Sequence, residues 1–451
     1  MKNLDNTIVH FIGIGGISMS GLALFMHKSG YIVQGSDKCY SKNMQMLQKN
    51  GINVFIGHDV SNIKNAEICI YTSAIDKNNP ELVYAKKHCL LIERSELLGK
   101  ICKSFKNTIA ISGTHGKTTT TAMIGQTLLC GNLDPTIHIG GNFDYIGGNF
   151  RFGGNKFIVT EACEYNKSFL QLQPDYLIIN NIELDHLDCY KNIEEIENAF
   201  LKLVSQTKKC VIINGDIDIF QKLKTNDKNL SQFIKFISFG EKSHCAYRMV
   251  NLRNNNEKYT FDIMHNNQYF TTIKMNISGK YNALNALACA AICDTLSIPI
   301  DIIKNSLEHF CGVERRLEIV NKLSDAVIIK DYAHHPTEIK NVLHNIKGQK
   351  YEKCVVIFQP HTYSRTLGLF NEFITCFNEC DSLILLPTYA ARETPILGGR
   401  SEDLYTALIK HKKNVYFAKD FDTAKQIALQ CISKNTCIIL LGAGDIENLF
   451  N

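Results

Sequence analysis

A glycine-bracketed loop between a short apolar run and a row of threonines is the feature that most constrains how this chain can fold. The apolar run is Thr108-Ile-Ala-Ile-Ser112, Gly113 and Gly116 bracket the loop, and Lys117 opens the threonine row. A strand that leads through such a loop into a helix turns backbone N–H groups toward a polyphosphate, and the lysine adds a positive charge. The sequence therefore predicts a parallel α/β sheet with a nucleotide site at the carboxyl end of this strand.

The phosphate loop is shorter than the common form, which would place a glycine at Ile111. A threonine hydroxyl at the start of the helix can bind the Mg²⁺ that accompanies a nucleotide, and Thr118 stands in that position. The alternative, an ordinary loop with a solvated lysine, leaves the row of threonines unexplained. The residues predicted to surround the nucleotide are Gly113, Thr114, His115, Gly116, Lys117, Thr118 and Thr119.

Length and composition are those of a globular enzyme. The chain has 451 residues, enough for about three domains of ~100–200 residues, and 45% of them are hydrophobic. The net charge is only +5, and no basic run carries interleaved aromatics, so we expect no nucleic-acid partner. No apolar run approaches the ~20 residues of a membrane helix and no signal peptide is evident, so we expect a cytoplasmic protein. The 17 scattered cysteines, an odd number without a Cys-x-x-Cys pair, indicate reduced thiols.

Apolar runs of strand length alternate with helical segments in three successive units. We expect strands at 7–12, 31–35, 52–55, 68–71, 108–112, 156–161, 176–181, 326–330, 354–358, 382–386 and 437–441, antiparallel β structure between 238 and 277, and an alanine-rich helix at 281–292. This rhythm is typical of open parallel sheets. The predicted domains are 1–106, 107–321 and 322–451.

A carboxylate and a histidine follow two strands of the second unit. Glu161 ends one strand, and His186 follows the next. The carboxyl ends of parallel strands lie at one edge of a sheet, so both side chains can face the phosphate loop. Together with Thr118 they are the predicted Mg²⁺ ligands. Taken alone, a carboxylate at a strand end is more often a helix cap or a surface group.

A second glycine-rich loop opens the chain. Gly13-x-Gly15-Gly16-x-Ser18 resembles the dinucleotide fingerprint, and Asp37 lies near the position of the acid that holds a ribose. Ser18 replaces the third glycine of that fingerprint. We therefore predict a diphosphate-bearing nucleotide site here without assigning a nicotinamide cofactor.

Several polar pairs have two interpretations. Asn282 and Asn285 lie on one helix face and could contact a base edge, or they could be a cap and a solvated amide. The pair Arg315-Arg316 could contact a phosphate or form a solvated hinge. Histidines cluster at Asp331-Tyr-Ala-His-His335 and at His361-Thr-Tyr-Ser-Arg365, but neither group has zinc-ligand spacing. Substrate contacts at strand ends are the favoured interpretation.

Five of these motifs together resemble the Mur ligase family, in the family's order and across essentially the whole chain. They are Gly13-Ile-Gly-Gly-Ile-Ser-Met-Ser-Gly-Leu-Ala23, Gly113-Thr-His-Gly-Lys-Thr-Thr-Thr120, Asn181-Ile-Glu-Leu-Asp-His-Leu-Asp188, Asp331-Tyr-Ala-His-His-Pro-Thr-Glu338 and Gly442-Ala-Gly444. The resemblance implies an N-terminal Rossmann-like domain that binds UDP, a central ATPase domain with the phosphate loop, and a C-terminal Rossmann-like domain that closes over the site.

The implied activity is ATP-dependent ligation in peptidoglycan precursor synthesis, with Mg²⁺. The form of the first loop favours members that add L-alanine to the lactyl carboxylate of UDP-N-acetylmuramate through an acyl phosphate. A monomer or weak homodimer is expected. By motif position, the implied catalytic residues are Lys117, His186, Arg316, Asp331, His335 and Arg365. The implied ATP contacts add Asn282 and Asn285, and the implied substrate contacts are Gly15, Gly16, Ser36, Asp37, Ser73, His335 and Arg365.

One position departs from the family pattern, and another cannot be aligned with it. Cys163 stands where many members carry aspartate, and Lys202 lies in about the region of a carbamylated lysine, so neither receives a role. Three alternatives remain. They are a recycling ligase that adds a peptide to the same sugar nucleotide, a non-catalytic nucleotide-binding regulator, and an NAD-dependent oxidoreductase, which does not explain the phosphate loop.

Overall fold

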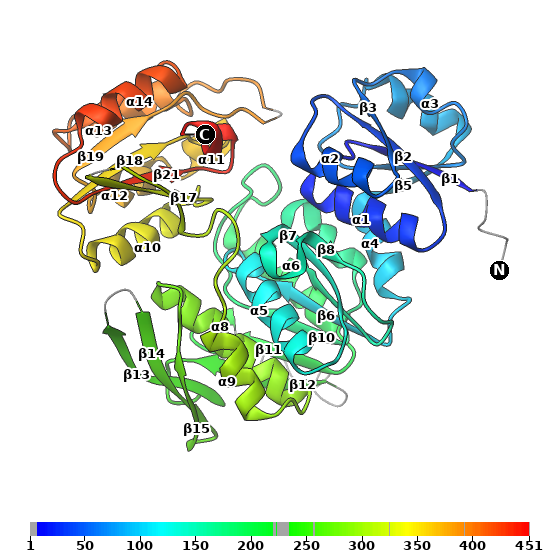
Figure 1. The fold of residues 1–451 in the computed structure, drawn as a ribbon, viewed down its shortest axis with the longest axis horizontal. Helices are drawn as coiled ribbons and strands as arrows, with labels where there is room; N and C mark the ends of the chain where they lie inside the picture. Colours follow the sequence, from blue (N-terminus) through cyan, green and yellow to red (C-terminus); the bar gives the residue numbers. More distant parts are fainter. Residues whose placement is uncertain are drawn as a thin grey trace.

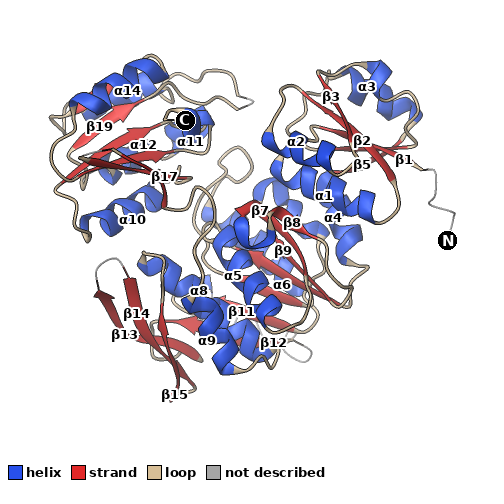
Figure 2. Cartoon of the chain, in the orientation of Figure 1, coloured by secondary structure: helices blue, strands red, loops and turns tan. Residues whose placement is uncertain are grey.

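The chain folds into three lobes, each built on its own sheet (Figure 1). The computed structural model describes residues 7–219, 222, 234–255, 258–323, 325–391 and 393–450. The first lobe (blue) and the third lobe (yellow to red) both rest against the middle lobe (cyan to green). In each lobe, helices cover the strands of the sheet (Figure 2).

The first lobe is a parallel sheet of five strands in the order β3-β2-β1-β4-β5. Strand β1 is central and buried, with Val9 and Phe11 in the core beside Leu22 of the first helix. The elements are β1 (Ile8–Ile12), α1 (Ile17–Lys28), β2 (Ile32–Asp37), α2 (Lys42–Lys49), β3 (Asn53–Ile56), β4 (Ile68–Tyr71), α3 (Pro80–His88), β5 (Leu90–Glu93) and α4 (Arg94–Cys102).

The middle lobe carries a sheet of ten strands in the order β15-β14-β13-β12-β11-β10-β6-β9-β7-β8. Its central strands are parallel, and β13, β14 and β15 form an antiparallel extension. Helices α5 and α8 pack together, and the small alanines of α8 permit this close approach. The elements are β6 (Asn107–Ser112), α5 (Lys117–Cys130), β7 (Thr136–Phe143), β8 (Gly148–Arg151), β9 (Phe157–Glu161), β10 (Tyr176–Ile179), α6 (Ile193–Ser205), β11 (Cys210–Asn214), β12 (Lys235–Gly240), β13 (Tyr247–Asn255), β14 (Lys258–His265), β15 (Gln268–Lys274), α8 (Lys280–Thr295) and α9 (Ile300–Glu308).

The third lobe is a six-stranded sheet in the order β16-β17-β21-β18-β19-β20, parallel except for the edge strand β16. The elements are β16 (Glu318–Lys322), β17 (Ala326–Asp331), α10 (Pro336–Lys347), β18 (Lys353–Phe358), α11 (Tyr363–Gly368), α12 (Phe370–Cys376), β19 (Ser382–Leu385), α13 (Ser401–Leu408), β20 (Val415–Phe417), α14 (Phe421–Gln430) and β21 (Thr436–Leu441). Short 3₁₀ turns occur at Val60–Asn62, Asp144–Ile146, Tyr165–Gln171 and Asp445–Asn448.

The predicted three-sheet α/β architecture is confirmed, and every predicted strand has a counterpart. One boundary differs. The edge strand β16 begins at Glu318, so the third sheet starts before the predicted division between residues 321 and 322. All 17 cysteines are free thiols. Among the described residues, no helix is long and apolar enough to cross a membrane.

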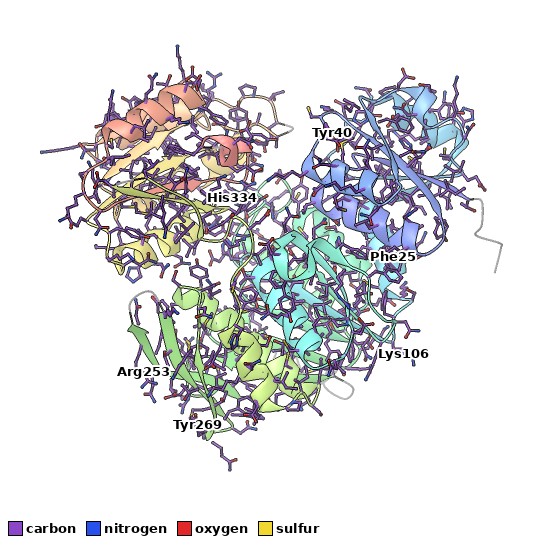
Figure 3. All side chains as sticks on the ribbon, viewed as in Figure 1. Phe25, Tyr40, Lys106, Arg253, Tyr269 and His334 are labelled. Carbon is purple, nitrogen blue, oxygen red and sulfur yellow. The ribbon has the colours of Figure 1, made fainter. Side chains whose placement is uncertain are left out.

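Aromatic and polar contacts join the first two lobes. Phe25 of α1 packs edge-on against Phe150 of β8, with ring centroids 6.2 Å apart, and Figure 3 places it on the side of the first lobe that faces the middle lobe. The Ser18 hydroxyl lies 3.1 Å from Nε2 of His138, and Arg94 donates to the same hydroxyl. These contacts anchor the first glycine-rich loop beside the middle sheet.

Candidate active site

The phosphate loop lies between the carboxyl ends of three adjacent strands. Strand β6 carries the loop, β9 lies on one side and β10 on the other. Gly113 and Gly116 have φ values of 133° and 80°, which favour glycine. An added Cβ at Gly116 would lie 2.6 Å from Oδ1 of Asn285, so the amide of α8 packs directly on the loop. Helix α5 begins at Lys117 and points its N-terminus into this loop.

Lys117 is held by a carboxylate from the neighbouring strand end. Its Nζ donates to Oε1 and Oε2 of Glu164 at 3.0 and 2.9 Å, and also to the carbonyls of Gly113 and Thr114. Burial lowers the pKa of Lys117, but the Glu164 carboxylate outweighs it and raises that pKa above its usual range. Burial opposes ionisation of Glu164 as well, yet Lys117 and His186 keep its pKa below its usual range. Both groups are therefore charged.

Glu161 ends β9 beside the start of α5. Its Oε1 accepts from the N–H of Gly140 at 2.6 Å, and Thr118 of α5 is close enough to influence the carboxylate. Burial raises the pKa of Glu161, and the charge of Lys117 opposes that rise. A half-buried carboxylate near a hydroxyl and a phosphate loop is the oxygen-rich environment that Mg²⁺ prefers.

His186 occupies a strained position in the loop after β10. Its φ is 55°, and its Nε2 lies 3.4 Å from Oε1 of Glu164 and 3.8 Å from Oδ2 of Asp185. The structure thus pairs His186 with Glu164, while Glu161 and Thr118 lie on the other side of Lys117. Lys117 is electrostatically coupled to both carboxylates.

A cavity of about 310 Å³ extends from the phosphate loop toward the third lobe. Its lining includes the apolar side chains of Ile217, Phe239 and Leu284, and the amide of Asn285. This combination of an apolar slot, an amide and a phosphate loop suits a nucleoside phosphate. Asn282 donates to the Ser278 carbonyl, accepts from the Asn285 amide at 3.3 Å and lines an adjoining cavity of about 730 Å³ that shares Arg316 with the first. The cavity of about 310 Å³ is lined by His115, Gly116, Thr119, Asn180, Asn181, Glu183, Asn214, Ile217, Phe239, Tyr281, Leu284, Asn285, Arg316, Asp331, Glu338, Asn341 and Val342.

The third lobe supplies charged groups to the same cavity. Arg316 and Asp331 line it, and the Arg316 guanidinium lies 5.1 Å from the ring centroid of Tyr332. The carboxylate of Asp331 accepts the backbone N–H groups of Leu317 and Ala333, both at 2.8 Å. Burial raises the pKa of Asp331 to about 6, against the opposing charge of Arg316. Arg316 and Asp331 thus line the same cavity as the phosphate loop.

His115 connects the phosphate loop to the third lobe. Its Nδ1 lies 2.9 Å from Oε1 of Glu338, and its Nε2 lies 3.4 Å from Oε2 of Glu183. Burial lowers the pKa of His115, but the Glu338 and Glu183 carboxylates outweigh it and raise that pKa to about 10. The ring of His335 lies beside that of His115, with centroids 5.0 Å apart. His335 donates from Nε2 to the Leu184 carbonyl at 3.3 Å.

Arg365 crosses from α11 to the loop that carries His186. Its Nε and Nη2 donate to the two carboxylate oxygens of Asp185 at 2.9 and 3.2 Å, and both side chains are buried. The pair holds the pKa of Asp185 well below its usual range, although burial opposes ionisation. In Figure 3 His334 lies on the side of the third lobe that faces the centre of the molecule. Burial, reinforced by the Arg365 charge, lowers the pKa of His334 to about 3.

The first glycine-rich loop follows β1, as predicted. The N–H of Gly15 donates to Oδ2 of Asp37 at 2.9 Å, and the Ser36 carbonyl accepts the N–H of Gly13 at 2.8 Å. Ser36 differs from the predicted substrate contact, because its fully buried hydroxyl donates to Glu81 inside the lobe. Ser36 therefore shapes the loop through its backbone, while its hydroxyl is unavailable to a ligand.

The predicted substrate contact Ser73 lies between the first two lobes. It is exposed and lines a cavity of about 250 Å³ with Arg94, Tyr165 and Lys167. Gly16 precedes α1 and is exposed at the loop. Both positions are open to a ligand that approaches between the lobes.

The sequence interpretation missed the residues that hold the predicted ones in place. Glu164, Glu183, Asp185 and Glu338 all contact a predicted site residue. Glu183, Asp185 and Glu338 stand within motifs already quoted, and Glu164 lies three residues after Glu161, so closeness in the sequence to a predicted site residue was the available signal. Of the two positions left without a role, Cys163 lines the cavity beside Ser73, and Lys202 is exposed on α6.

Comparison with known proteins matches all three lobes to one family. Models described as "Mur ligase family, catalytic domain", "Mur ligase middle domain" and "Mur ligase, glutamate ligase domain" match residues 8–106, 111–293 and 315–444. The chain belongs to the Mur ligase family. The matched ranges of this Mur ligase coincide closely with its three sheets.

Individual Mur ligases are similar along nearly the full length. The UDP-N-acetylmuramate–L-alanine ligase of Caldicellulosiruptor saccharolyticus is 41% identical over 440 residues, 97% of this chain and 96% of the relative. That of Clostridium novyi is 41% identical over 453 residues, 98% of this chain and 96% of the relative. The crystal structure of the UDP-N-acetylmuramate-alanine ligase from Thermotoga maritima has a TM-score of 0.83 at 30% identity, covering 98% of this chain and 96% of that one.

Proposed function

We propose that this protein joins L-alanine to the lactyl carboxylate of UDP-N-acetylmuramate, with conversion of ATP to ADP and phosphate. One observation carries the proposal. The phosphate loop opens into a cavity that Arg316 and Asp331 of the third lobe complete, in a chain 41% identical to enzymes named for this reaction. The relative from Thermotoga maritima, similar over 98% of this chain, has a name that states the same chemistry. Because the reaction consumes ATP, we also infer a cytoplasmic location.

ATP would bind with its phosphates on the loop and its base in the apolar slot. The loop N–H groups and the N-terminus of α5 favour the phosphates, and Lys117 supplies a fixed positive charge. Ile217 and Phe239 offer the apolar contact that a purine face needs, and the Asn285 amide can contact its edge. Arg316 approaches from the third lobe and would neutralise phosphate charge.

The reaction would proceed in two balanced steps. The lactyl carboxylate attacks the γ-phosphorus of ATP, forming an acyl phosphate and releasing ADP. The neutral amine of L-alanine then attacks the acyl carbon, its nitrogen gives up one proton to solvent, and the tetrahedral intermediate collapses to the amide as phosphate leaves. Negative charge develops on phosphoryl and carboxyl oxygens in both steps, so preorganised cations such as Lys117 and Arg316 would lower the barrier most.

Magnesium fits two sets of residues near the loop. Thr118 with Glu161, and Glu164 with His186, offer oxygen and nitrogen donors on either side of Lys117. When bound, the ion would neutralise phosphate charge. The fit rests on the carboxylates of Glu161 and Glu164, which lie beside the phosphate loop and the Lys117 ammonium group.

Two predicted catalytic residues have a different proposed task. Arg365 is bonded to Asp185, and His335 to the Leu184 carbonyl, so both act on the loop that carries His186. We therefore place them as positioning residues that fix this loop when the third lobe docks. A direct contact of either group with the substrate carboxylate would require these bonds to be exchanged.

A turnover assay tests the function. The purified protein is incubated with ATP, Mg²⁺ and UDP-N-acetylmuramate together with L-alanine, glycine, L-serine or a tripeptide, and ADP release is followed. We expect turnover to be highest with L-alanine and to require the sugar nucleotide. A preference for the tripeptide would establish a recycling ligase. Tight nucleotide binding without turnover on any amino acid would establish a regulator.

A further inference from the structure

Two histidines and a carboxylate converge where the third lobe meets the phosphate loop. His115 and Glu183 come from the middle lobe and His335 from the start of α10. One ligand atom from each lies within 4.8 Å of the other two. We propose that these three residues bind a transition-metal dication such as Zn²⁺ and thereby fasten the third lobe to the phosphate loop. This site is separate from the proposed magnesium ligands.

The distances suit a small ion. Nε2 of His115 lies 3.4 Å from Oε2 of Glu183, and Nδ1 of His335 lies 4.0 Å from the same oxygen. Zinc bonds of about 2.0–2.2 Å in a tetrahedron place ligand atoms roughly 3.3 Å apart. The pair of His115 and Glu183 already has this spacing. In the other pair the His335 ring would have to move slightly closer to Glu183.

The outer contacts of each ligand are those that metal sites use. Nδ1 of His115 faces the Glu338 carboxylate at 2.9 Å, and Nε2 of His335 faces the Leu184 carbonyl at 3.3 Å. A histidine that binds a metal through one nitrogen typically donates from the other to a carboxylate or carbonyl, which fixes the ring. Thr337 completes the pattern by donating from its hydroxyl to Oε2 of Glu183 at 2.7 Å.

An unsatisfied atom points to the same position. Among the described residues, none hydrogen-bonds to the buried Nε2 of His115, which contacts Glu183 only at ion-pair distance. Buried polar atoms without partners are rare in native proteins. Nδ1 of His335 accepts a long hydrogen bond of 3.3 Å from the Thr337 N–H. The Nδ1 lone pair can give up this weak bond and bind an ion instead. Two imidazoles and one carboxylate favour zinc, nickel or cobalt over magnesium.

Binding would compete with a proton. The Glu338 and Glu183 carboxylates favour the protonated His115 ring, and the ion must displace that proton. Affinity is therefore expected to fall at lower pH. An ion held by both lobes would also restrain the loop between Gly113 and Lys117.

Cobalt binding to the full-length protein, without nucleotide, tests the proposal. We expect one equivalent of Co²⁺ to give visible d–d bands without a thiolate charge-transfer band, and Zn²⁺ to displace it. Glu183→Gln and His335→Gln should abolish these bands. The matched control is Glu379→Gln, which removes a carboxylate that faces the exposed His344 of the same lobe at 3.4 Å. This variant should retain the bands.

A second readout separates a folding defect from loss of the site. Zn²⁺ should raise the midpoint of thermal unfolding of the wild type and of Glu379→Gln, but not of Glu183→Gln. Circular dichroism without metal checks that each variant is folded, and if Glu183→Gln is not, His335→Gln decides. Any of three results would overturn the proposal. They are d–d bands that stay unchanged in the folded variants, Co²⁺ spectra with thiolate bands alone, and a wild type that does not bind Co²⁺.

Discussion

The ammonium group of Lys117 lies 2.9 and 3.0 Å from the two carboxylate oxygens of Glu164. Only 14% of the lysine side chain and 3% of the glutamate side chain are exposed. The pair therefore preserves the charge of Lys117 in a buried loop before any phosphate arrives. When a nucleotide binds here, its phosphate replaces the Glu164 carboxylate as the anion beside Lys117. Because the Lys117 ammonium group is already removed from water, binding adds little further desolvation cost for this group.

Removing the lysine should reduce both activity and stability. In Lys117→Met we expect kcat to fall by about 10²–10³-fold, the effect of losing one charge-stabilising group. The Glu164 carboxylate would also lose its lysine partner and keep only His186 at 3.4 Å, at a cost of up to about 3–5 kcal/mol. The double variant Lys117→Met/Glu164→Gln should recover most of the unfolding free energy but none of the activity. Thermal unfolding and ADP release measure the two effects, and an active double variant would contradict this role.

Breaking the ion pair between Arg365 and Asp185 should destabilise the docking of the third lobe. In Asp185→Asn the guanidinium is left buried without its carboxylate, at a cost of about 3–5 kcal/mol. Asp185→Asn/Arg365→Gln should recover part of this loss. The control is Glu96→Gln at the exposed pair with Lys100, where the change should stay within about 1 kcal/mol. Thermal unfolding measures each, and equal effects at both sites would refute the argument.

The strands and the phosphate loop could be predicted because their signals are local. Strand β18 is a continuous apolar run, and the loop is marked by Gly113 and Gly116, whose positive φ values few other residues tolerate. The edge strand β16 is polar and largely exposed, so no apolar alternation revealed it, and the domain boundary was placed too late. Strand β7 was missed because Gly140 and Gly141 interrupt its apolar pattern.

The site residues could be predicted in part for the same reason. Lys117, Glu161 and His186 follow strand ends, and parallel topology brings strand ends together. The contacts of His115 with Glu338 depend on how the third lobe docks, and no local pattern specifies this. The buried hydroxyl of Ser36 likewise depends on a partner distant in the sequence, Glu81.

The buried carboxyl of Asp331 should make stability fall as the pH rises. Its folded-state pKa of about 6 exceeds the unfolded value of about 3.9, so the folded protein binds more protons between these values. The stabilisation is full below the unfolded pKa and is lost as the pH passes through 6. It amounts to about 3 kcal/mol, since one pKa unit is about 1.4 kcal/mol. Midpoints of thermal unfolding at several pH values, compared between wild type and Asp331→Asn, isolate this group. A constant difference across the range would refute the prediction.

A side chain at Gly116 should weaken nucleotide binding. The added Cβ of Gly116→Ala meets Oδ1 of Asn285 at 2.6 Å, and the φ of 80° is itself unfavourable for alanine. The loop or the amide must move, so we expect the affinity for ATP to fall by about tenfold or more.

The control for this prediction has the same backbone strain without the contact. Gly147 has a φ of 72°, and nothing lies within 4 Å of an added Cβ there. The positive φ should therefore cost Gly147→Ala about as much stability as it costs Gly116→Ala. The affinity of Gly147→Ala for ATP should nevertheless equal that of the wild type. Titration calorimetry with ATP measures both variants. Equal affinities would mean that the packing of Asn285 on the loop has no part in nucleotide binding, because only Gly116 carries that contact.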